Sequence, residues 1–67
     1  MNYYQINLIK LAVKLAESSK LTVDEVMEII YCNEDDAQKL MHELTLIGLA
    51  TWNPVYKGTI DRNPAFV

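Results

Sequence analysis

The stretch Leu21–Trp52, LTVDEVMEIIYCNEDDAQKLMHELTLIGLATW, decides the fold of this chain. It opens with the residue types and spacing of a capping box, in which the Thr22 hydroxyl accepts from the Glu25 amide and the Glu25 carboxylate accepts from the Thr22 amide. Leu21 and Val26 occupy the two positions of a hydrophobic staple around this cap. We therefore expect an amphipathic helix to begin directly after Thr22.

Two helices joined by a tight turn are predicted within this stretch. The first, Val23–Tyr31, has apolar residues at helical spacing and carboxylates on its other side. The second, Glu34–Ile47, follows Asn33 as an N-cap and ends before Gly48. Its apolar residues repeat at steps of three and four and predict one buried face, made of Ala37, Leu40, Met41, Leu44 and Ile47.

Strand-forming residues replace the helical pattern after Gly48. One strand is expected over Leu49–Trp52 and a second over Val55–Ile60, joined by the turn signal Asn53-Pro54. The remaining residues, 61–67, are expected to form a tail. The pattern therefore predicts a β-hairpin at the C-terminal end of the chain.

Trp52 has two alternative positions in this hairpin. If Leu49 points into the core, strand alternation sends Trp52 to the opposite face, where an outward Trp would anchor a partner. In the alternative, the hairpin twists and Trp52 packs over the Glu34–Ile47 helix or over the N-terminal helix. The pattern leaves both positions open.

A third helix is predicted over Tyr3–Ser18, capped by Asn2. Its apolar stripe is wider than one core-facing side of a helix needs. We expect the surplus to mediate a symmetric homodimer, because a small domain gains stability by burying it. The residues expected in this interface are Tyr3, Ile6, Ile9 and Val13.

The residue types and motifs of the chain exclude several classes of protein. A single cysteine excludes an internal disulfide, and Cys32 with His42 supplies too few ligands for a structural zinc site. Neither a leader nor a bilayer-spanning stretch is visible, and no phosphate-binding loop or nucleophile motif occurs. We expect one domain over residues 1–67, a whole small cytoplasmic protein that does not associate with membranes. No catalytic residue, metal or cofactor is expected.

From about Leu8 to Ile60 the chain resembles the winged helix-turn-helix superfamily of small regulators. Three motifs carry the resemblance: Leu21–Val26, Asp36–Leu44 and Ile47–Trp52. It implies a mainly α fold of three helices and a C-terminal β-hairpin, which in this family is called the wing. The implied division is helix 1 over 1–20, the helix-turn-helix over 21–48, the wing over 49–60 and a tail over 61–67.

The resemblance implies a non-enzymatic regulator that binds duplex DNA as a dimer, in transcription control. In this family the outward face of the second helix of the motif enters the major groove, and here that face is Glu34, Asp35, Gln38, Lys39 and His42. Gln38 would read an adenine edge, and Lys39 would reach guanine or phosphate. Lys57 on the wing would contact backbone phosphate. The alternative reading is that these scattered lysines form an ordinary solvated surface.

One segment departs from the DNA-binding pattern. Thr22–Asp36 carries six carboxylates and no basic residue, although DNA affinity is dominated by neutralisation of phosphates. Carboxylates in a first helical turn also favour the helix dipole by roughly 0.3–1 kcal/mol each, which explains most of the run structurally. The alternative function is a protein-binding adaptor or phage-type inhibitor that docks on a basic partner or mimics nucleic-acid charge. Its expected docking residues are Asp24, Glu28, Glu34, Asp35 and Trp52.

Overall fold

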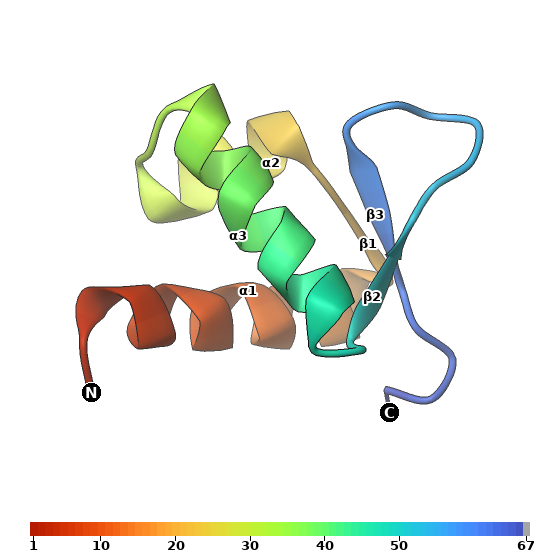
Figure 1. Ribbon diagram of the computed structural model, residues 1–67, viewed down its shortest axis with the longest axis horizontal. Coiled ribbons are helices and arrows are strands. Elements are labelled where there is room, and N and C mark those ends of the chain that lie inside the picture. The colour runs from red at the N-terminus through yellow and green to blue at the C-terminus, as the bar shows by residue number, and fades with distance from the viewer. Residues whose placement is uncertain (67) are drawn as a thin grey trace.

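The computed structural model describes residues 1–66 and contains three helices and a three-stranded antiparallel sheet (Figure 1). The helices are α1 (Tyr3–Ser18), α2 (Val23–Ile30) and α3 (Glu34–Leu46). The strands are β1 (Lys20–Thr22), β2 (Ala50–Trp52) and β3 (Thr59–Arg62), in the order β1-β3-β2. This confirms the mainly helical fold with a C-terminal hairpin and is compatible with a winged-helix-like fold.

Local side-chain caps begin all three helices, as the sequence predicts. The Asn2 side chain accepts from the Gln5 amide at 2.9 Å, and the Asn33 side chain accepts from the Asp36 amide at 2.8 Å. At the start of α2 the capping box is complete, with the Thr22 amide donating to Glu25 Oε1 at 3.0 Å. Because each cap satisfies amides that have no partner inside the helix, the local sequence marks where each helix begins.

The helix ends lie close to the predicted positions. Gly48, at φ +86°, closes α3 in a Schellman motif, in which the Leu49 amide donates to the Leu44 carbonyl at 3.0 Å. Ile47 is the C-cap of α3 and is half exposed, so its prediction as a member of the buried face is wrong. Tyr31, predicted as the last helical residue of α2, is instead its C-cap in a left-handed conformation at φ +59°.

The sheet differs most from the prediction. The sequence pattern missed β1, which pairs with β3 through Lys20↔Asp61, Leu21↔Ile60 and Thr22↔Thr59. Three residues are too few to show an alternating pattern, and β1 exists because β3 lies beside it. The tail predicted over 61–67 is also partly wrong, because residues 61 and 62 belong to β3. Val67 lies outside the described residues.

The second strand of the hairpin begins later than predicted. Val55–Lys57, expected within a strand, lie in the β2–β3 loop. Here the Asn53 side chain accepts from the amides of Val55 and Tyr56, at 2.8 Å each, and forms an Asx turn. Those amides are therefore not free to join a strand ladder. Below, the β2–β3 hairpin, residues 50–62, is called the wing.

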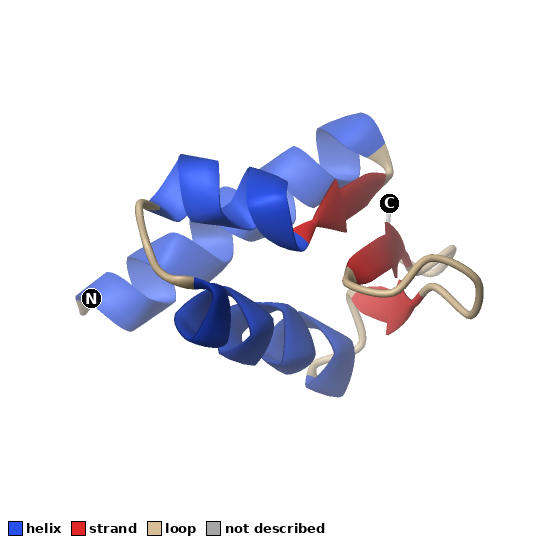
Figure 2. Ribbon diagram, turned by 90° about the horizontal axis from the view of Figure 1, so that it is seen from above, coloured by secondary structure: helices blue, strands red, loops and turns tan. Residues whose placement is uncertain are grey.

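The core lies where the three helices meet the inner face of the sheet. Leu40 and Leu44 of α3 are buried there, which confirms their prediction. The other buried apolar residues are Leu11, Leu15, Leu21, Val26, Ala37, Met41, Ala50 and Ile60. Figure 2 shows the strands gathered at the end of the molecule away from the N-terminus, with the wing loop projecting beyond them. Within residues 1–66, no helix is long and apolar enough to cross a membrane.

Candidate nucleic-acid interface

The polar side of α3 faces solvent and does not pack in the core. Gln38, Lys39 and His42 are exposed, whereas Leu40 and Met41 on the other side of the helix are buried. This division follows from the helical spacing of the apolar residues, which leaves the intervening positions to solvent. Three of the four residues predicted to bind nucleic acid therefore share one exposed helix face.

These side chains border a hollow between α3 and the wing. It has a volume of about 370 Å³, and it is called the α3–wing hollow below. The residues that line it are Asp35, Gln38, Lys39, His42, Trp52 and Gly58. The structure thus brings the α3 residues of the predicted site together with the wing.

Lys57, the fourth predicted residue, borders an adjoining hollow of about 410 Å³. That hollow shares Gln38 and Gly58 with the α3–wing hollow, and it is also lined by the acidic residues Asp24 and Glu34. The wing lysine therefore stands beside carboxylates from the first turns of α2 and α3. No ion pair between Lys57 and these carboxylates is present within the described residues.

Trp52 faces the helices because of strand register. Ala50, rather than Leu49, is the buried residue at the start of β2, and Trp52 lies on the same side of the strand as Ala50. Its Cα partner across the ladder is the buried Ile60. Leu49 packs partly buried against the core but precedes β2, so strand alternation does not run from it and the outward position of Trp52 is wrong. Trp52 lies beside α3 and remains 40% exposed.

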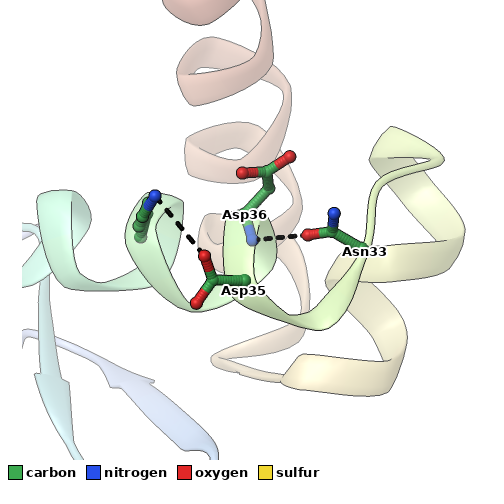
Figure 3. A network of polar contacts seen from close by, with 4 residues as sticks. Asn33, Asp35 and Asp36 are labelled. Carbon is green, nitrogen blue, oxygen red and sulfur yellow. Dashed lines mark hydrogen bonds and ion pairs between the residues drawn. The ribbon is translucent and has the colours of Figure 1, made fainter.

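An exposed ion pair occupies the outward face of α3. Lys39 Nζ lies 3.4 Å from Asp35 Oδ2, and both side chains are more than 70% exposed. Figure 3 shows that Asp35 and Asp36 project in different directions from this first turn. A solvent-exposed pair four residues apart on a helix contributes only about 0.3–0.5 kcal/mol, so a stronger anion can draw Lys39 away from Asp35.

The predicted acidic docking residues are spread over three hollows, and Asp24 and Glu34 share the one that Lys57 borders. Asp24 also lines, with Glu28, a hollow of about 770 Å³ on α2, here called the α2 hollow. Its other lining residues are Met27, Tyr31 and Cys32. Asp35 and Trp52, in contrast, belong to the α3–wing hollow, with the residues predicted for nucleic acid.

Cys32 has the environment of a structural thiol. Partial burial and, secondarily, the charge of Asp36 raise the pKa of its thiol. The reactive form of cysteine is the thiolate, which this shift disfavours. Among residues 1–66, no three His, Cys, Asp or Glu side chains converge as metal ligands.

The residues predicted for a dimer lie on the side of α1 that faces away from the core. Leu11 and Leu15 bury the inner side of this helix. The exposed fractions on the outer side are 83% for Tyr3, 37% for Ile6, 50% for Ile9 and 54% for Val13. Helix α1 therefore carries apolar side chains on two opposite faces, and one of them is uncovered in the single chain.

Two contributions to the site escaped the sequence analysis. Gly58 lets the wing approach α2, and the Asn53 side chain fixes the shape of the wing loop. The Asn53-Pro54 turn and the glycine after Lys57 were the available signals, but neither indicates which segment it contacts.

Comparison of the chain with protein-family models, with curated proteins and with solved structures gives no match.

Proposed function

We propose that this protein is a small non-enzymatic regulator that binds duplex DNA in transcription control, with α3 in the major groove and the wing over the backbone. The observation that supports this proposal is the exposure of Gln38, Lys39 and His42 on one face of α3, beside the wing. A helix that reads bases must present polar side chains away from its own core, and α3 has this organisation.

The chemistry of each polar side chain suits a separate role. The Gln38 amide can form paired hydrogen bonds with an adenine edge, and Lys39 can donate to guanine or to phosphate. Lys57 carries a positive charge on the wing, where it would neutralise a backbone phosphate. His42 lies one helical turn beyond Gln38 and extends the polar face along α3.

The acidic first turns limit the strength of this binding. Asp35 pairs with Lys39, and Glu34 lines the same hollow as Lys57, so both lysines have carboxylates nearby. The slope of log affinity against log salt scales with the number of phosphates neutralised. We therefore expect weak binding to random sequences and a shallow salt dependence, with selectivity supplied by base contacts.

The form that binds DNA in this proposal is a homodimer joined through α1. In a twofold pair the same patch is used on both copies, so the uncovered stripe around Ile9 would be buried by its own counterpart. Burying apolar surface in this way adds stability to a domain that is too small to bury a large core of its own. Two copies would also present two α3 helices to one duplex.

A salt series with random-sequence duplex DNA tests the proposal directly. We expect measurable binding at low salt that weakens gently as salt is added. The absence of binding to any duplex at low salt would contradict it and favour the second candidate function.

That second candidate is docking on a basic protein partner. It is favoured by the α2 hollow, the largest of the hollows described, which has two carboxylates and no basic residue in its lining. Met27 and the exposed Tyr31 add apolar surface to the same hollow. A partner segment with lysines or arginines and an apolar side chain would complement this surface.

A further inference from the structure

Trp52 is the one tryptophan of the chain, and it leaves 40% of its surface exposed in the α3–wing hollow. The neighbouring side chains Asp35, Gln38, Lys39 and His42 are polar or charged, and Asp35 is paired with Lys39, so the indole is the apolar side chain among polar ones. Aromatic rings in such settings supply a large contact area to a partner and lose little conformational entropy.

The backbone around Trp52 is held on several sides. Its partner across the ladder is Ile60, which is fully buried. The next residue, Asn53, donates its amide to the Thr59 carbonyl at 2.9 Å and its side-chain amide to Asp61 Oδ2 at 2.9 Å. Backbone held in this way adds little ordering cost on binding.

The position of Trp52 relates it to the proposed DNA complex. If α3 enters the major groove and the wing carries Lys57 to a phosphate, one backbone strand passes between α3 and the wing. That path would run over the hollow in which Trp52 lies. The indole offers an apolar ring that can cover a deoxyribose and an N–H group that can donate to a phosphate oxygen.

We infer that Trp52 is an uncharged positioning contact for the DNA backbone in the α3–wing hollow, an inference that rests on the proposed function. It packs against one sugar and donates its indole N–H to an adjacent phosphate. An uncharged side chain releases no counterion, so this contact adds affinity without adding to the salt slope. This behaviour separates its contribution from that of Lys39 and Lys57.

The fluorescence of the indole reports whether DNA occupies the α3–wing hollow, because Trp52 is the chain's one tryptophan. Titration of the unmodified chain with duplex DNA should change its fluorescence intensity or emission maximum, with saturation at the affinity measured by an independent method. Duplex binding without any change in tryptophan emission would overturn the inference. This measurement needs no variant and does not depend on the folding of one.

Two substitutions measure the energetic contribution of Trp52. Trp52→Ala should weaken duplex binding by about five- to tenfold, and Trp52→Phe, which keeps an aromatic ring but lacks the N–H, by less. Both should leave the salt slope at its wild-type value. Tyr31→Ala is the matched control, because Tyr31 is an exposed aromatic in the α2 hollow, and it should bind as the wild type does.

The outcomes separate this inference from the proposed function. If duplex DNA binds and the folded Trp52→Phe and Trp52→Ala variants keep full affinity, the Trp52 contact is wrong and the DNA-binding proposal stands. A reduced salt slope in Trp52→Ala would also overturn an uncharged contact, because it would show that phosphate neutralisation had been lost. If no duplex binds to the wild type, both are wrong.

Discussion

Val23 and Gly58 meet where the wing joins α2, and this contact ties the helices to the hairpin. The Val23 amide donates to the Gly58 carbonyl at 2.9 Å. A Cβ atom built on Gly58 would lie 3.2 Å from Val23 Cγ2, and the φ of Gly58 is +72°. The wing therefore reaches α2 at a residue where both the space and the backbone conformation favour glycine.

Gly58→Ala should destabilise the fold more than Gly48→Ala does. Both glycines have positive φ, so each substitution incurs a left-handed backbone penalty of about 1–2 kcal/mol. A Cβ at Gly48 would meet nothing within 4 Å, whereas one at Gly58 must push Val23 aside. Chemical unfolding of the two variants measures the difference. Equal losses in the free energy of unfolding would show that the close approach of Gly58 to α2 does not contribute to stability.

Leu44→Ala should lower the free energy of unfolding by about 2–5 kcal/mol, because Leu44 is fully buried and its truncation leaves a cavity. That loss approaches the whole stability expected of a domain this small. Leu46→Ala is the matched control on the same helix. Leu46 is largely exposed, and its loss should change stability by no more than about 0.5 kcal/mol. Denaturant titration followed by circular dichroism compares the two.

The wild-type chain should sediment as a dimer at tens of micromolar, because the outer stripe of α1 is otherwise left in water. Ile9→Glu should give a folded monomer, since it places a charge at the centre of the proposed interface. Lys14→Glu, also an exposed change on α1, serves as a control that leaves the apolar stripe intact. A wild type that is monomeric at this concentration counts against the interface.

Lys39→Ala and Lys57→Ala should each reduce the slope of log affinity against log salt by about one unit. Lys10→Ala, a change of the same type on α1, should leave the slope unchanged if that helix lies away from the duplex. Gln38→Ala should relax base preference and keep the slope, because the amide carries no charge. Slopes that stay the same in both the Lys39 and Lys57 variants would remove these residues from the backbone contact.

The double change Glu34→Lys and Asp35→Lys tests what the acidic tip of α3 does in each candidate function. It replaces repulsion by attraction at the tip of α3, so duplex binding should appear or strengthen. The Asn33 cap remains, but the helix loses roughly 0.3–1 kcal/mol per carboxylate and the pair between Asp35 and Lys39. Recovery of binding partners from lysate provides the second measurement. A protein complex that depends on the acidic tip should be lost, and unchanged recovery would exclude this tip as the docking site.

The helices were readable from sequence because their determinants are local. The Thr22–Glu25 box and the Asn33 cap act over three residues, and the apolar repeat that buries Leu40 and Leu44 acts over one turn. α1 has the predicted bounds, and α2 and α3 each end one residue early. Caps and apolar spacing within one or two turns mark where such elements lie, and packing of their apolar faces then supplies most of their stability.

The sheet and the composition of the site were decided by the tertiary structure. Leu21 forms part of a strand only because Ile60, far along the chain, lies opposite it. Trp52 joins Gln38 and Lys39 because the same strand register turns it toward α3. A shift of one residue in register reverses every side chain of a strand, and no local pattern specifies which segment will supply the partner. The sequence alone therefore determined the helices and their exposed faces, while long-range pairing determined which side chains meet beside α3.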